Sequence, residues 1–321
     1  MSQESRVRGV LRPSILMGAA VWLTLALASF APRVHLGIIE VLFLLGPWMV
    51  VPLGADLMRG AGVSKGHAVR DRMLFTAASL TTVSFFLDNR TLATWFASAW
   101  VLVCGGFAGD GLRRFVNAGR KSFTQFCFAA GEGYLLVAGV WLVASRAGLQ
   151  ILAFREPIVL LTAVHFHFAG FASAVLAGLT YERFRESNWK AALQSALTAV
   201  VCGPAILGLA FMLGPKVKLV AALLIALGQF GLAAGLVRAG IAAKNAAGRW
   251  LLFVAGGSVA AGMILAVVWA IGEYPLEAFV NIRQMAELHG VLNAVGFVVC
   301  GLLGWSVASS GYKRREDLGV S

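Results

Sequence analysis

The sequence predicts an all-α membrane protein, a polytopic bundle of about ten transmembrane helices. The first observation is composition: 59% of the 321 residues are apolar and only 13% are charged, whereas an ordinary soluble domain carries about 45–50% and about 25%. The mean hydropathy of +0.80 agrees. A soluble globule of this composition would have too few polar residues for its surface, and disordered chains, coiled coils and disulfide scaffolds each require a different composition.

The second observation is that the apolar residues gather in ten runs, and a helix needs about 20 such residues to cross a bilayer. The runs are continuous and do not alternate, which excludes membrane-spanning strands. They fill about two-thirds of the chain, so we expect one integral membrane domain over 1–321 and no soluble domain. The predicted spans are 14–32, 36–54, 73–87, 91–109, 123–144, 157–181, 192–214, 217–240, 250–272 and 285–309.

Two of these runs need individual justification. The first follows three arginines and resembles a signal peptide, but its apolar stretch exceeds the usual ~7–15 residues, so we expect an uncleaved anchor. The third, 73–87, is the shortest, and the polar residues 88–90 after it indicate a tight turn. The other runs are separated by short polar or basic loops.

The third observation is the distribution of basic residues, which explains the net charge of +12 and the pI near 10.2. With the N-terminus inside, 20 of the 27 Lys and Arg residues fall in inner segments. The positive-inside rule then places both termini in the cytoplasm. Because the basic clusters are short and separated by membrane, no nucleic-acid partner is expected. The outer basic residues are Arg33, Arg90, Arg146, Arg155, Lys216, Lys218 and Arg283.

Cysteine and glycine fit a packed bundle. The cysteines share no metal-ligand spacing and are expected to be packing residues rather than disulfides. The pair Gly231 and Gly235 and the run Gly105, Gly106 and Gly109 fit close helix packing; they indicate a dimer face only weakly, so the oligomeric state stays open. The four cysteines are Cys104, Cys127, Cys202 and Cys300.

A weak internal repeat is present at an offset of 157 residues. Gly-Pro occurs at 46–47 and at 203–204, and the pattern x-Gly followed by a second glycine occurs at 132–139 and at 289–296. A unit of five spans repeated once would be inverted, as in many transporters that bind substrate at the repeat interface. The match involves few residues.

The candidate functional residues are the polar groups inside predicted spans, because such groups are costly in a bilayer and usually face the bundle interior. Depths counted at about 1.5 Å per residue place all of them between the midplane and the outer face. This predicts one outward-facing site that binds a substrate or a proton. The candidates are Glu40, Glu132, His165, His167, His289 and Asn293.

Helical geometry constrains the histidines. His289 and Asn293 are four residues apart and share one helix face. His165 and His167 are two apart and point about 200° away from each other. We therefore expect one of the two to face the cavity and the other to bond a neighbouring helix. The residue pattern does not show which of them faces the cavity.

Glu132 is the candidate least easily explained by packing. Gly131 and Gly133 flank it and would let a helix or a ligand approach closely. Because an isolated carboxylate is costly in hydrocarbon, we predict that Glu132 carries the proton of a proton-coupled mechanism.

The run His165-Phe166-His167-Phe168-Ala169-Gly170-Phe171 and the run His289-Gly290-x-x-Asn293-Ala294-x-Gly296-Phe297 resemble the YndJ-like family of bacterial membrane proteins. The resemblance implies a polytopic bacterial membrane protein, which we expect in the cytoplasmic (inner) membrane, and it implies no particular chemistry.

The His-Phe-His run also resembles the haem-binding helix of haem–copper oxidases. A copper oxidase needs more intramembrane histidines than this chain has. A single bis-histidine haem, held by His289 with His165 or His167, stays open; no other cofactor or metal is expected.

Three function classes follow. The favoured one is a transporter of a small lipophilic or amphipathic substrate, in which Glu132 binds a proton and the histidines with Asn293 contact the substrate. The second is an intramembrane acid–base enzyme that acts on a lipid or isoprenoid-like substrate through Glu132 and a histidine. The third is an assembly or scaffold protein whose polar groups only join helices.

Overall fold

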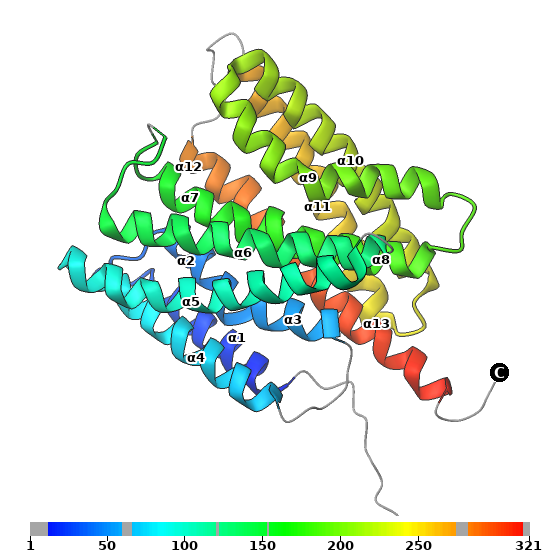
Figure 1. Cartoon of the computed structure of the whole chain (residues 1–321), viewed down its shortest axis with the longest axis horizontal. Helices are drawn as coiled ribbons and strands as arrows, with labels where there is room; N and C mark the ends of the chain where they lie inside the picture. Colours follow the sequence, from blue (N-terminus) through cyan, green and yellow to red (C-terminus); the bar gives the residue numbers. More distant parts are fainter. Residues whose placement is uncertain (1–11, 60–65, 120–121, 153, 274–281, 317–321) are drawn as a thin grey trace, which may run out of the picture.

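Helices form the regular structure because a chain this apolar must satisfy its backbone polar groups internally. The computed structural model describes residues 12–59, 66–119, 122–152, 154–273 and 282–316 (Figure 1). Within these ranges every regular element is helical, and the one β-type pairing is an isolated bridge between Ile151 and Phe154. The all-α polytopic fold class is confirmed.

The elements in chain order are α1 (Pro13–Ala28), α2 (Ile38–Leu45), η1 (Gly46–Val50), α3 (Val51–Arg59), α4 (Gly66–Ser84), α5 (Arg90–Arg114), η2 (Phe115–Gly119), α6 (Phe123–Ala147), α7 (Ile158–His165), η3 (Phe166–Ala172), α8 (Ser173–Phe184), α9 (Lys190–Leu213), α10 (Pro215–Ala242), α11 (Ala246–Glu273), α12 (Ile282–Met285), η4 (Ala286–Gly290), η5 (Leu292–Val299) and α13 (Cys300–Glu316). The η elements are π-helical, and in several spans α and η segments follow one another within one helix.

Each predicted apolar run corresponds to a described helix, but two runs are weaker spans than the rest. Eight helices are long and apolar enough to cross a membrane by length and composition. Helix α1 has only 16 residues. Helix α4 begins at Gly66, seven residues before the predicted start at 73, and its added first turns are polar. The chain is thus a multi-pass membrane protein with eight to ten spans.

Many helix ends lie beyond the predicted limits because capping and polar residues continue the helical pattern, although α1 and α4 end before the predicted limits of 32 and 87. The side chain of Asn89 caps α5 by accepting a hydrogen bond from the Leu92 amide at 3.1 Å, and Ser122 caps α6 in the same way. Gly148 ends α6 in the left-handed conformation, at φ 67°, which glycine adopts without strain. Helix α5 continues to Arg114 rather than ending at 109.

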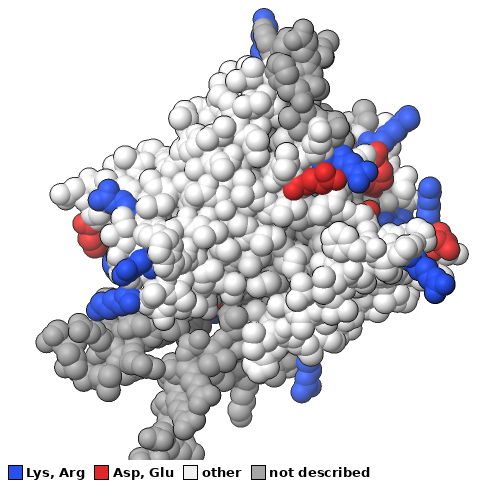
Figure 2. Space-filling model, turned by 180° about the vertical axis from the view of Figure 1, so that it is seen from behind, with Lys and Arg blue, Asp and Glu red and all other residues white. Residues whose placement is uncertain are grey.

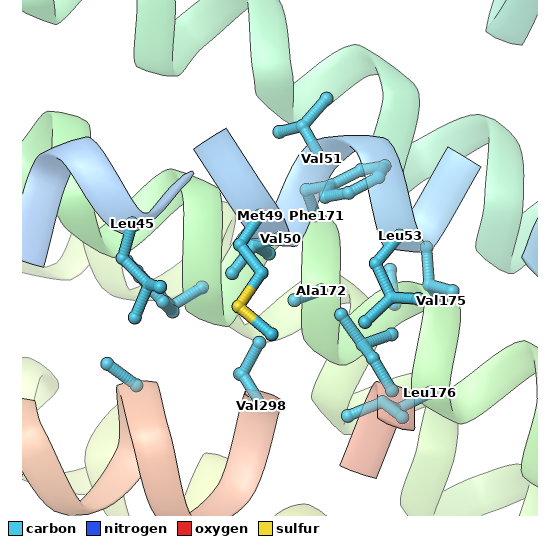
Figure 3. Close-up of a cluster of buried hydrophobic side chains, with 14 of the residues drawn as sticks. Leu45, Met49, Val50, Val51, Leu53, Phe171, Ala172, Val175, Leu176 and Val298 are labelled. Carbon is cyan, nitrogen blue, oxygen red and sulfur yellow. The ribbon is translucent and has the colours of Figure 1, made fainter. Parts of the chain in front are cut away.

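The centre of the bundle is formed by the second and sixth spans. The apolar windows of Ile38–Arg59 and Ile158–Phe184 are 72% and 67% buried, more than those of the other spans. Helices α5 and α6 pack on one side of them, whereas α9, α10 and α11 form a second layer (Figure 1). Figure 3 shows this centre, where Met49 and Val50 of the second span lie beside Phe171 and Ala172 of the sixth span. Val298 of the tenth span lies beside Met49 in the same buried cluster.

The two ends of the bundle carry its charged side chains. Figure 2 shows them gathered mainly at opposite ends of one face, with a broad uncharged band between. We call the end with the C-termini of α3, α5 and α8 the predicted cytoplasmic end, and the end with the C-terminus of α6 and the start of α7 the predicted outer end. The inner basic residues Arg6, Arg8, Lys65, Arg120 and Lys121 lie outside the described residues.

Helix irregularities do not follow the repeat offset. Gly46-Pro47 begins the π-helical segment η1, but Gly203-Pro204 lies within the regular helix α9. Likewise Glu132 lies in the regular helix α6, whereas His289 lies in η4. The described structure therefore gives the predicted duplication no support from corresponding broken helices.

Candidate functional site

Three spans are interrupted by π-helical segments at the sequence motifs that stand out. Gly46-Pro47 starts η1 in the second span, the His-Phe-His run enters η3 in the sixth, and His289 with Asn293 lies in η4 and η5 of the tenth. Element η3 contacts both η1 and η5, and α2 contacts η4. Three irregular segments from distant parts of the chain thus meet in the middle of the bundle, and π-helical turns are frequent at functional sites.

His167 is a fully buried packing residue with both ring nitrogens engaged. The indole N–H of Trp100 donates to its Nε2 at 3.0 Å, so the ring proton lies on Nδ1. Nδ1 donates to the carbonyl of Ala163 at 2.8 Å. Phe43 meets the ring edge-on, with centroids 5.1 Å apart. A buried polar ring with both nitrogens paired holds three spans together and has no nitrogen left for a ligand.

Gly46 is required by the close approach of His167. A Cβ at position 46 would lie 2.9 Å from Cδ2 of the imidazole and 3.1 Å from Cγ. Since real Cβ atoms rarely come that close, a side chain here would displace the ring or the helix. The first Gly-Pro pair of the sequence therefore has a packing explanation.

His165 is the member of the pair that faces outward. Its side chain is exposed on the bundle surface, and its ring forms no hydrogen bond with other described residues. It lies near His289, close enough for a charge on one ring to act on the other. The opposite directions expected for two histidines two residues apart are observed, and the structure assigns the free one.

His289 joins the ninth and tenth spans and keeps one nitrogen available. Its Nδ1 lies 2.8 Å from the carbonyl oxygen of Gly262, so Nδ1 donates and Nε2 retains its lone pair. Asn293 lies one turn further along and donates to the carbonyl of His289 at 2.8 Å. A Cβ at Gly262 would collide with the Asn293 amide, so this glycine makes room for the polar pair.

Glu132 does not join the histidines. The guanidinium Nε of Arg114 donates to its carboxylate at 3.0 Å, and a second nitrogen of Arg114 donates to Gln125 at 2.9 Å. The carboxylate is only 2% exposed. The neighbouring Gly131 packs on Phe171 and Ala174.

This corrects the expectation that Glu132 lies in the outer half of one shared cavity. Phe171, on which Gly131 packs, is six residues and therefore roughly 9 Å beyond His165 along the sixth span, so Glu132 lies on the predicted cytoplasmic side of His165. The physical reason is that α5 continues to Arg114 and its long side chain reaches back along α6. An acid–base pair of Glu132 with a histidine is therefore not formed.

Ion pairs close the predicted cytoplasmic end. Besides Arg114 and Glu132, Arg70 of α4 pairs with Asp110 of α5 at 3.2 Å. Arg12, directly before α1, pairs with Asp56 of α3 at 3.0 Å. The side chains are 22–42% exposed in the latter two pairs. The three contacts join the first span to the second, and the third span to the fourth and the fourth to the fifth.

Glu40 lies at the predicted outer end, in the first turn of α2, beside a cavity of about 180 Å³. The cavity also brings together Arg146, from the last turn of α6, and Glu156, which precedes α7. Pro157 and Glu156 are exposed, so the cavity borders the surface. Its other lining residues are Ile39, Ser145 and Leu160.

Several residues of these clusters were not predicted from the sequence. Arg146 and Arg114 were assigned to loops, and Glu156 and Trp100 were not singled out. A signal existed for Arg146, because a basic residue in the last turn of a helix faces the negative end of the helix dipole. For Trp100 there was none, since a tryptophan in a span usually faces lipid or the interface.

The positions of the histidines and cysteines restrict which metals and cofactors the described residues could bind. No group of three or more His, Cys, Asp or Glu side chains in the described ranges could hold a metal ion. A haem on His289 with His167 does not fit, because both nitrogens of His167 are engaged. A haem on His289 with His165 stays a prediction. All four cysteines are free.

The predicted packing glycines divide into two groups. Gly231 and Gly235 of α10 fit against Ala196 of α9 and Thr180 of α8. Around Gly105, Gly106 and Gly109 on α5, by contrast, a Cβ would meet nothing within 4 Å.

Comparison with known proteins identifies one family. The model of the family described as YndJ-like protein matches residues 41–297. A segment of 175 residues is 29% identical to the uncharacterized membrane protein YndJ of Bacillus subtilis (strain 168), and this segment covers 54% of the present chain and 31% of that protein. The chain therefore matches less than a third of the length of its curated relative. No solved structure matches the chain.

Proposed function

This chain belongs to the YndJ-like family of multi-pass membrane proteins, and we propose that it is a carrier that moves a small amphipathic molecule, such as a lipid, across the membrane. The observation that carries the proposal is the meeting of π-helical segments from the second, sixth and tenth spans around the histidines. A regular α-helix resists bending, whereas a π-turn loosens the ladder of backbone hydrogen bonds and offers a hinge. Transporters commonly place substrate contacts at such interrupted helices.

The substrate contacts of this carrier are His165, His289 and Asn293. His165 has no ring hydrogen bond among the described residues, and Nε2 of His289 retains a lone pair. Both histidines lie about seven residues, roughly 10 Å, inside their spans. Asn293 holds His289 in place through the backbone.

An amphipathic substrate suits the surroundings of these residues. His165 is exposed on the surface of the bundle, at a depth where hydrocarbon surrounds the protein. Leu288, directly before His289, is 58% exposed. A molecule that reaches these side chains through the bilayer must carry both apolar and polar groups.

The two ends support an outward-facing arrangement. The predicted cytoplasmic end is held together by three ion pairs, whereas the predicted outer end contains the cavity beside Glu40 and Arg146. In an alternating-access cycle the paired end would open as the other closes. Arg114 and Glu132 are then gate residues rather than a proton site.

The proposal is tested in proteoliposomes that contain phosphatidylethanolamine with an NBD fluorophore on one acyl chain. Dithionite quenches only the outer leaflet, so a carrier should raise the quenched fraction above that of protein-free liposomes. His165→Ala and His289→Ala should lower the transfer rate. Glu287→Gln, in the exposed ion pair between Arg283 of α12 and Glu287 of η4, is the matched control and should behave as wild type.

A quenched fraction equal to that of protein-free liposomes for labelled phosphatidylethanolamine, phosphatidylglycerol and phosphatidylcholine alike would contradict the carrier function. Undiminished transfer by folded His165→Ala and His289→Ala proteins would contradict the role of the two histidines as substrate contacts. If these variants instead lose only thermal stability, the histidines serve helix packing, as in a scaffold protein.

A further inference from the structure

The cavity at the predicted outer end is surrounded by three charged side chains that do not pair with one another. Glu40, Arg146 and Glu156 all line it. Among the described residues Arg146 forms no ion pair with either carboxylate, although the charges are near enough to interact. Opposite charges this close usually form a direct contact, as they do at the other end of the bundle.

Arg146 also leaves a buried donor unused. Its Nε is inaccessible to solvent and has no hydrogen-bond partner in the part of the chain that the structure describes. An unpaired buried donor is costly, and because Nε is enclosed, the other atoms of this side chain are the ones that line the cavity and can meet a ligand. The guanidinium is held in position over the ring of Phe85, 4.8 Å from the centroid.

The carboxylates are fixed by the helices that carry them. Glu156 accepts a hydrogen bond from the Leu160 amide in the first turn of α7, at 3.3 Å. Glu40 lies in the first turn of α2, and its Oε2 would be 2.8 Å from a Cβ at Gly37, so it folds back over the helix start. Helix dipoles favour these positions, which keeps the carboxylates apart around the cavity.

We propose that this cavity binds a zwitterion that combines a primary ammonium with a phosphate, the chemistry of phosphoethanolamine. The ammonium is placed between Glu40 and Glu156, and the phosphate accepts hydrogen bonds from Arg146. The inference rests on the proposed carrier function and specifies the headgroup that is recognised at its entrance.

Charge, depth and size favour this ligand class. The two carboxylates and one guanidinium that line the cavity have a net charge of −1, which disfavours binding of a purely anionic ligand and favours binding of an ammonium group. All three residues lie within one turn of a helix end, the depth of lipid headgroups. A volume of about 180 Å³ exceeds by far the ~30 Å³ of one water molecule, and Ile39 and Leu160 give the cavity an apolar part of its lining.

The experiment measures lipid retention by the purified full-length protein with native mass spectrometry. The probes are phosphatidylethanolamine, phosphatidylcholine and phosphatidylglycerol, each added at equal concentration. Wild type should retain phosphatidylethanolamine in preference to the other two. Glu40→Gln and Glu156→Gln should each weaken that binding by about tenfold, as expected for loss of one charged hydrogen bond.

Arg146→Gln should lower retention of all phospholipids, because it removes the contact to phosphate. Glu287→Gln is the matched control, a carboxylate at the same end in an exposed ion pair, and should keep the preference. An unchanged thermal midpoint without lipid shows that each variant is folded. Free phosphoethanolamine as competitor tests the headgroup alone: displacement of the lipid supports recognition through the headgroup, and no displacement at a large excess would show that the lipid is held elsewhere and would count against the inference.

Equal retention of the three lipids by wild type would overturn the inference, as would a full preference for phosphatidylethanolamine in both glutamine variants. The outcome is separable from that of the carrier function. Selective binding without transfer between leaflets would leave this inference standing and remove the carrier, whereas transfer without selectivity would do the reverse.

Discussion

At the predicted cytoplasmic end Arg114 and Glu132 form an ion pair of 3.0 Å, whereas at the predicted outer end Arg146 lies near Glu40 and Glu156 and pairs with neither among the described residues. Both arginines come from ends of neighbouring spans, α5 and α6. The difference is the space between the charged groups: α5 and α6 pack closely at one end, but a cavity separates α2, α6 and the start of α7 at the other. Paired charges join helices, and separated charges remain available to a ligand.

The two histidines of the sixth span repeat this contrast on a smaller scale. His167 uses both ring nitrogens to join Trp100 and Ala163 and is fully buried. His165, two residues earlier, is exposed. We therefore expect substitutions in the paired groups to lower stability and substitutions in the free groups to lower binding or transport.

The largest stability effect is expected from Glu132→Gln at the paired end. Removing one partner leaves the Arg114 charge partly buried and unpaired, and such losses cost about 3–5 kcal/mol for fully buried pairs. Because the Arg114 side chain is 24% exposed, we expect a value near the lower limit, measured as thermal unfolding in detergent. A Glu132→Gln/Arg114→Leu double variant should be more stable than Glu132→Gln alone. A single variant as stable as wild type would show that the pair does not hold this end together.

Gly46→Ala should have the next largest effect, because the new methyl group meets the imidazole of His167. Overpacking of a tight core costs about 1–3 kcal/mol. Gly105→Ala is the matched control: nothing lies within 4 Å of its Cβ, so it should be neutral or gain up to about 1 kcal/mol from helix propensity. Equal midpoints for the two variants would mean that His167 moves freely.

Trp100→Phe tests the hydrogen bond that fixes His167. It keeps an aromatic ring but leaves Nε2 as a buried acceptor without a donor, at a cost of about 1–3 kcal/mol. His165→Ala should change the free energy of unfolding by less than about 0.5 kcal/mol, as for exposed groups outside special contacts, and should reduce leaflet transfer. If His165→Ala were less stable than Trp100→Phe, the interpretation of His167 as the packing residue and of His165 as the free one would be wrong.

The smallest effect on stability is expected for Glu40→Gln at the outer end. With no ion pair to lose among the described residues, the variant should unfold within about 0.5 kcal/mol of wild type. The same protein should lose its preference for phosphatidylethanolamine. A large loss of stability would show that Glu40 is a structural residue, and the two ends would then resemble each other.

Much of the site was accessible from the residue pattern, but the grouping of its members was not. The similar depths of His165 and His289 and the shared face of His289 and Asn293 follow from helix periodicity, because each requires only distances along one helix. The position of Glu132 required the offset between α5 and α6, since Arg114 reaches it from the end of another span. The cytoplasmic location of both termini stays a prediction that rests on the 20 inner basic residues and can be checked with C-terminal reporter fusions.

The sequence by itself determined that this is a polytopic membrane protein, because runs of apolar residues must form helices in a solvent that cannot satisfy the backbone. It also determined which polar residues are costly enough to need partners. Only the tertiary structure decided which partners they have: His167 with Trp100, Glu132 with Arg114, and Arg146 with a cavity. The physical reason is that pairing depends on how helices rotate and slide against one another, and that register is set by side-chain packing across spans far apart in the chain.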